Sequence, residues 1–177
     1  MTTMKPFTDT LGAIVTGVAG SRVATPAAAD IAAALDRYGV LVFPELFISD
    51  DDLAALSRRL GTVVVPAHGA IPGHPEIMPV SHDPQINLFA EVHSANDFWH
   101  TDGTSYERPD KATLLTARRA PDPGEGNTEF ASTFAAYEPL PVERRLALVG
   151  VRVRHTFASA QRHAFPDPTE KQAAMWA

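Results

Sequence analysis

His100 and Asp102 are the two side chains of this sequence whose types and spacing best fit metal chemistry. They lie two residues apart in the string Asn-Asp-Phe-Trp-His-Thr-Asp-Gly-Thr, residues 96–104. Alternate side chains of an extended segment point to the same face, so the imidazole and the carboxylate would lie close together. A second histidine from a distant strand would complete the two-histidine, one-carboxylate set that binds Fe(II) in non-haem oxygenases.

A chance match is the alternative interpretation of this pair, because His-x-Asp is a short pattern and the chain has seven histidines. The sequence has no cysteine, which excludes thiolate catalysis, zinc–cysteine sites and disulfides. The aromatic residues Phe98, Trp99 and Phe130 are better interpreted as core residues than as a cofactor site.

The composition predicts one soluble globular domain over residues 1–177. Apolar residues make up 45% of the chain, and the net charge is −6 without any cluster of basic residues. Nucleic-acid binding is therefore disfavoured. The first residues have no apolar core typical of a signal peptide, and no apolar run approaches the length of a membrane span. A cytoplasmic protein without membrane contact is the expectation.

The first third of the chain predicts strands alternating with helices. Residues 11–18 alternate loosely as a strand, and residues 40–43 form a fully apolar one. Between them, Thr25 and Pro26 are typical of a helix start, and Gly39 is typical of a left-handed helix end.

A second helix is predicted to begin after Ser49, because Ser49 followed by Asp52 is a capping signature, and to end at Gly61. The acidic run at 50–52 would complement the positive end of this helix dipole and is not expected to bind a metal.

Residues 62–97 are predicted to be a long irregular region with one short strand near residues 77–78. The region has five prolines and four of the seven histidines. A loop this long inside a compact domain is usually functional, so it is interpreted as a lid or binding loop.

From residue 98 onward the pattern predicts a mainly β domain with helices packed outside. The expected strands are 98–102, 112–118, 127–131 and 150–157, and the expected helices lie near 131–138 and 142–149. A last helix starts at Asp167 and runs to Ala177 with no stop signal, which indicates a cut in a longer sequence.

The order of these segments resembles one enzyme family over nearly the whole chain. Residues 99–104 are followed by a strand at 112–118, a Pro/Gly turn at 121–126, Asn127-Thr128, and Ala-Ala-Tyr-Glu at 135–138. This is similar to the taurine and 2,4-dichlorophenoxyacetate dioxygenases, whose pattern is W-H-[TS]-D, a strand, P-x-x-G-G-[DN]-T and then A-Y-[ED]-x-L. Further segments similar to that family are residues 11–18, 39–43, 58–61 and 153–155.

The resemblance implies a double-stranded β-helix, which is jelly-roll-like, with Fe(II) as cofactor and 2-oxoglutarate as cosubstrate. It implies hydroxylation of a small organic molecule by O2, with release of succinate and CO2. His100 and Asp102 would be iron ligands. Thr128 would bind a carboxylate of 2-oxoglutarate, although it also fits as an ordinary β-branched strand residue. Asn96 would line the cosubstrate and substrate pocket, and it fits equally well as a turn residue.

The chain departs from the family pattern in two ways. The family's second histidine and the arginine that binds the other 2-oxoglutarate carboxylate would lie beyond Ala177, so the domain is expected to be incomplete at its C-terminus. The family's taurine-binding histidine falls near residues 64–66, where this chain has none, although His68 is close. Taurine is therefore disfavoured, and an alkyl sulfonate, a sulfate ester or a small carboxylate is expected.

The remaining histidines are predicted to be structural or solvated. His155 could be offered as the missing ligand, but it matches a family histidine that is not a ligand and is interpreted as structural. His163 is expected at the surface. Of His74, His82, His93 and His68, one is expected to reach the substrate. The rival to the enzyme hypothesis is an inactive fragment or remnant that binds or assembles with a second chain, and a homo-oligomer remains open in both cases.

Overall fold

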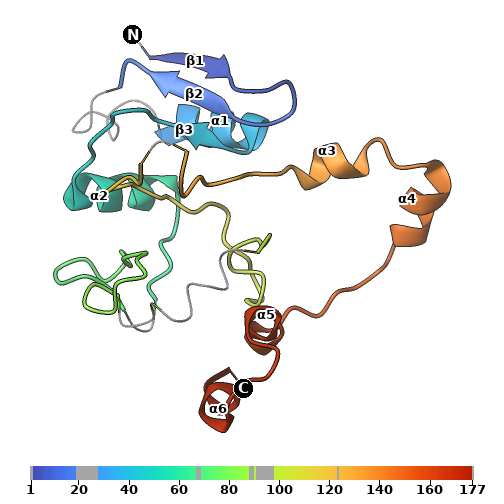
Figure 1. Cartoon of the computed structure of the whole chain (residues 1–177). Coiled ribbons are helices and arrows are strands. Elements are labelled where there is room, and N and C mark those ends of the chain that lie inside the picture. The colour runs from blue at the N-terminus through green and yellow to red at the C-terminus, as the bar shows by residue number, and fades with distance from the viewer. Residues whose placement is uncertain are drawn as a thin grey trace. The chain divides into compact units, whose positions relative to one another are not determined.

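The computed structural model describes residues 2–18, 28–66, 69–87, 90, 98–122 and 124–176 (Figure 1). Within these residues the chain forms three strands and six helices. Its contacts group it into two units, which are described separately. The first unit comprises Met1–Val63 and Leu114–Val151, and the second comprises Val64–Thr113 and Arg152–Ala177. No helix of the described part is long and apolar enough to cross a lipid bilayer.

The first unit contains a small sheet with the strand order β1-β2-β3. β1 (Thr3–Pro6) pairs antiparallel with β2 (Ala13–Thr16), and β2 pairs in parallel with β3 (Leu41–Val42). β2 and β3 confirm the expected strands at 11–18 and 40–43, whereas β1 was not predicted. Ala13 and Val15 are buried, so β2 contributes to the core of this unit.

Helix α1 (Ala28–Tyr38) connects β2 to β3 and buries Ile31 and Ala34. It ends at Gly39 as predicted, where the backbone φ is +70° and the amide donates to the Leu35 carbonyl at 2.8 Å. A side chain at position 39 would also place its Cβ 3.0 Å from the Leu11 side chain. Glycine is thus required for both conformation and space. The predicted helix start at residues 25–26 lies outside the described residues.

Helix α2 (Asp50–Leu60) begins as its capping signature predicts. The Ser49 hydroxyl accepts a hydrogen bond from the Asp52 amide at 3.1 Å and donates to the Asp52 carboxylate at 2.8 Å. The acidic first turn complements the helix dipole, and Leu53, Ala54 and Leu56 bury one face of the helix.

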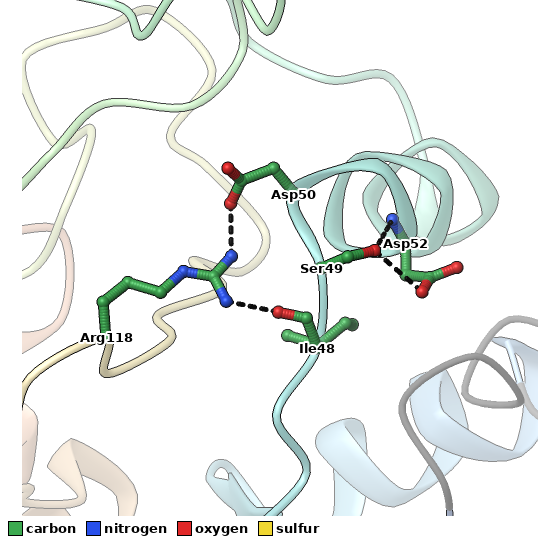
Figure 2. A network of polar contacts seen from close by, with 5 residues as sticks. All are labelled: Ile48, Ser49, Asp50, Asp52 and Arg118. Carbon is green, nitrogen blue, oxygen red and sulfur yellow. Dashed lines mark hydrogen bonds and ion pairs between the residues drawn. The ribbon is translucent and has the colours of Figure 1, made fainter.

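Arg118 connects a segment distant in the sequence to the start of α2 through two polar contacts. Figure 2 shows its guanidinium donating to the Ile48 carbonyl and to the Asp50 carboxylate, which lie 70 and 68 residues away in the sequence. Ile48 is buried at 3% exposure, whereas the Asp50 and Arg118 side chains are partly exposed. The fork of guanidinium donors suits two acceptors at once, which a lysine could not match.

Arg118→Met is therefore expected to lower the free energy of unfolding by about 1 kcal/mol, because a partly exposed ion pair and a hydrogen bond to a carbonyl are lost. Urea unfolding followed by circular dichroism measures the change. Arg119→Met makes the same substitution one residue further on and is the matched control. Equal stabilities of the two variants would contradict a structural role for Arg118.

Helices α3 (Thr133–Tyr137) and α4 (Val142–Leu148) confirm the helices expected near 131–138 and 142–149. The Ser132 hydroxyl caps α3 by accepting from the Ala135 amide at 3.2 Å. Neither helix has a buried residue, and Phe134 and Leu146 are among the exposed apolar side chains of this unit.

The second unit is mainly loop, with two helices near the end of the chain. α5 (Phe157–Ala164) is capped by Thr156, whose hydroxyl accepts from the Ser159 amide at 3.1 Å. α6 (Glu170–Trp176) confirms the predicted last helix. The rings of Phe165 and Trp176 lie 6.1 Å apart, and Trp176 is buried.

The strands expected in the second half of the chain are wrong for this structure. The segments 98–102, 112–118, 127–131 and 150–157 form no β-ladder, the expected strand near 77–78 is irregular, and residues 157–164 are helical instead. Alternating apolar residues give a strand only where a neighbouring strand accepts and donates backbone hydrogen bonds. The structure pairs none of these segments with another strand. Several of their apolar side chains are also exposed, so no core packs on them: Leu115, Phe130, Val151 and Val153.

Candidate metal centre

The structure brings the side chains of His100 and Asp102 together, although the segment that holds them is not a strand. His100 Nε2 lies 3.4 Å from Asp102 Oδ1, and the two side chains are 48% and 50% exposed. Both belong to the second unit, so their geometry is set within one unit.

The hydrogen bond of His100 fixes which ring nitrogen is available to a metal. Its Nδ1 lies 2.7 Å from the Phe98 carbonyl oxygen. A carbonyl oxygen can only accept, so Nδ1 carries the hydrogen and Nε2 presents its lone pair in the neutral ring. Nε2 and a carboxylate oxygen then face each other as two acceptors. A metal cation between the two acceptors would make this arrangement favourable.

The second carboxylate oxygen of Asp102 is held by a different residue. Thr113 Oγ1 donates to Asp102 Oδ2 at 2.7 Å. Oδ1 is the oxygen that faces the imidazole, so the carboxylate has one oxygen hydrogen-bonded and one directed toward His100.

These distances fit a bound metal ion. Two neighbouring ligands at about 2.1 Å from an octahedral metal lie about 3 Å apart, which is close to the observed 3.4 Å. Metal-bound histidines usually donate their other N–H to a carbonyl or carboxylate, and ligating carboxylates are themselves hydrogen-bonded. Both features are present. One imidazole and one carboxylate are two of the three ligands in the set of two histidines and one carboxylate that binds Fe(II).

A tight turn after Asp102 brings Thr113 back to it. Gly103 has a φ of +68°, and the Tyr106 amide donates to its carbonyl at 3.0 Å. A Cβ at position 103 would lie 2.8 Å from the Asp110 carboxylate and 2.9 Å from the Asp110 amide nitrogen. Only glycine allows both this conformation and this close approach of the returning chain.

Helix α5 contributes one contact to the neighbourhood of the pair. The ring of His163 meets the ring of Phe98 edge-on, with centroids 4.4 Å apart and planes at 76°. His163 is exposed, as expected for a surface residue, but the prediction did not include its contact with Phe98. The backbone carbonyl of that same Phe98 accepts from His100.

The other predicted site residues are not brought to this pair by the described contacts. Thr128 is exposed in an irregular segment of the first unit. Asn96, His68 and His93 lie outside the described residues, so their predicted roles stay predictions. His82 and His155 are exposed, and His74 is half-buried in a turn. In the described part of the chain, no group of three or more His, Cys, Asp or Glu side chains could hold a metal.

Sequence reasoning missed Thr113, which is the residue that most directly supports Asp102. Its only sequence signals are the turn-forming Gly103 and Pro109, which indicate that the chain reverses between the two. They do not indicate which residue of the returning segment reaches the carboxylate.

Comparison with known proteins gives a family match over almost all of this sequence. The family described as "Taurine catabolism dioxygenase TauD, TfdA family" matches residues 3–176. Pentalenolactone F synthase of Streptomyces avermitilis is 34% identical over 155 residues, which cover 84% of this chain and 51% of that protein. The (S)-phenoxypropionate/alpha-ketoglutarate-dioxygenase of Sphingobium herbicidovorans is 27% identical over 157 residues, or 88% of this chain and 54% of that protein.

The chain thus spans about half the length of the curated relatives it matches. Among solved structures, that of AAD-2 in complex with Mn(II) and N-oxalylglycine superposes with a TM-score of 0.71 at 23% identity. The superposition covers 99% of this chain and 61% of AAD-2, which is a likeness of fold to a longer protein.

Proposed function

Because this chain belongs to the TauD, TfdA dioxygenase family, we propose that it supplies two iron ligands to an Fe(II)- and 2-oxoglutarate-dependent dioxygenase. The ligands are His100 Nε2 and Asp102 Oδ1. The observation that carries the proposal is their 3.4 Å separation, with the remaining nitrogen and oxygen of the pair held by hydrogen bonds. That arrangement is typical of metal ligands with outer partners.

In the proposed reaction, the iron and the residues around it have separate roles. The bound iron would supply the oxidative chemistry, in which 2-oxoglutarate gives succinate and CO2 and a C–H bond of a second molecule is hydroxylated. The Phe98 carbonyl holds the imidazole in the tautomer that leaves Nε2 free. Thr128 would donate its hydroxyl hydrogen to a carboxylate of 2-oxoglutarate.

The proposed complete fold is a double-stranded β-helix with flanking helices. Its support is the superposition on AAD-2 over 99% of this chain. In such a fold, strands distant in the sequence would cover the extended segments around residues 112–118 and 150–157.

The proposed primary substrate is a small organic acid. A relative named for phenoxypropionate supports a carboxylate, and the absence of a histidine at residues 64–66 argues against taurine. An alkyl sulfonate or a sulfate ester presents a comparable anionic oxygen group. Asn96 and His68 are the proposed substrate contacts.

Succinate release by the complete gene product tests this function. The protein is purified under argon, loaded with Fe(II) and supplied with 2-oxoglutarate, O2 and a panel of small carboxylates, sulfonates and sulfate esters. Succinate formation that increases with one class of the panel is expected. A protein that binds iron but forms no succinate with any of them would instead support a binding module.

Thr128→Val removes the hydroxyl while keeping the branched side chain, and it is expected to raise the KM for 2-oxoglutarate about tenfold or more. A hydrogen bond to a charged group contributes roughly 1.5–3 kcal/mol. Steady-state succinate assays at varied 2-oxoglutarate measure the change. Thr62→Val, at an exposed threonine after α2, is the control. An unchanged KM for 2-oxoglutarate with a changed KM for the primary substrate would assign Thr128 to the other ligand.

A further inference from the structure

We propose that Thr113 is a positioning residue that restricts Asp102 to ligation through a single oxygen. The inference rests on the proposed function and adds to it a residue outside the ligand set. The Thr113 hydroxyl donates to Asp102 Oδ2 at 2.7 Å, while Oδ1 faces His100 Nε2 at 3.4 Å. The two oxygens of one carboxylate therefore have different partners.

The geometry of the carboxylate decides how many coordination positions it occupies. A free carboxylate can bind a metal ion through one oxygen or through both. A hydroxyl that donates to Oδ2 competes with the metal for the lone pairs of that oxygen, whereas Oδ1 has no such competitor among the contacts described here. The hydroxyl hydrogen must point to the carboxylate, because an ionised carboxylate can only accept.

Single-oxygen ligation matters because the proposed reaction needs open positions on the metal. Two imidazoles and one carboxylate oxygen would leave three positions of an octahedral ion open. A keto acid bound through two oxygens, together with O2, would need all three. If both oxygens of Asp102 were bound, one of these positions would be lost.

The turn between Asp102 and Thr113 brings the threonine hydroxyl to the carboxylate. Asp102 and Thr113 are separated by eleven residues, and the chain between them reverses at Gly103. The Asp110 backbone passes so close to Gly103 that a Cβ there would lie 2.9 Å from the Asp110 nitrogen. The close passage fixes the segment that carries Thr113 three residues later.

The test compares Thr113→Val and Thr113→Ser in the complete protein, with Co(II) as the probe. Serine keeps the hydroxyl and valine removes it. Thr116→Val, three residues further along the chain, is the matched control. Titration gives the Co(II) affinity, and the visible absorption of bound Co(II) reports its coordination number without any turnover. Loss of an outer partner of a ligand typically weakens metal binding 10–100-fold.

Thr113→Val is expected to bind Co(II) about tenfold or more weakly, with a spectrum shifted toward higher coordination number, and Thr113→Ser is expected to restore both properties. Thermal unfolding of the metal-free variants checks that they fold, and Thr113→Ala replaces the valine variant if that one does not. Wild-type affinity and spectrum without the hydroxyl would overturn the inference, as would a serine variant that fails to restore them. The proposed function fails separately, if the wild-type protein binds no Co(II) at all.

Discussion

His100→Ala and Asp102→Ala in the complete protein are each expected to abolish succinate formation from 2-oxoglutarate while leaving the fold intact. Each substitution removes one of the two donor atoms that face each other at 3.4 Å. The loss in metal affinity should exceed about 100-fold, the upper end of what removing an outer partner of a ligand costs. Both side chains are about half exposed, so their truncation creates no cavity in a core.

Anaerobic titration with Fe(II) and a succinate assay measure the two effects, and circular dichroism checks the fold. His82→Ala removes an exposed histidine of the same unit and is the matched control. Near wild-type succinate formation by either ligand variant would refute the assignment of that residue to the metal.

A polypeptide of these 177 residues, prepared alone, is expected to bind Fe(II) weakly, to form no succinate and to self-associate. Among the described residues the His100–Asp102 pair belongs to no larger group of metal-binding side chains, so these residues would hold the ion with two protein ligands. Fe(II) is low in the Irving–Williams order, so Zn(II) or Cu(II) should displace it from such a site.

The expected self-association follows from apolar surface. Large apolar side chains are exposed in segments outside the described strands and helices, and exposed apolar surface favours association. Among these side chains are Leu115, Val149, Val151 and Val153. Light scattering during the iron titration measures association. If the monomer instead binds iron tightly at one ion per chain and forms succinate, the third ligand lies within these residues. His155 would then be the first residue to replace by mutation.

The features predicted correctly from the sequence are those that neighbouring residues determine. Ser49 caps α2 through a hydrogen bond to Asp52, which is only three residues away in the sequence, and Gly39 ends α1 because its own φ is positive. Both signals act within one helical turn, so they can be recognised without knowledge of the rest of the fold.

The expected strands failed because a strand depends on a partner that the local sequence does not specify. Residues 150–157 alternate apolar and polar side chains, yet the structure forms no strand at 151–156 and begins α5 at Phe157. Tertiary context overrides strand propensity in this way more readily than it overrides a helix cap.

In the candidate site, too, the contact between residues close in the sequence was predicted and the contact between more distant residues was not. The two-residue spacing of His100 and Asp102 predicted that they would lie together, and they do. Thr113 and Arg118 could not be predicted, because each acts on a residue that a turn or a long stretch of chain separates from it. Asn96 and His68 lie outside the described residues, so their roles stay predictions.

The different sequence separations of these two contacts have a consequence for the order of folding. Bringing together the ends of a flexible loop costs more entropy as the loop lengthens. Closing the 68-residue loop between Asp50 and Arg118 costs about 1.6 kcal/mol more than closing the eleven-residue loop between Asp102 and Thr113. The contact between the carboxylate and its hydroxyl partner is therefore expected to form earlier during folding than the contact between α2 and its arginine.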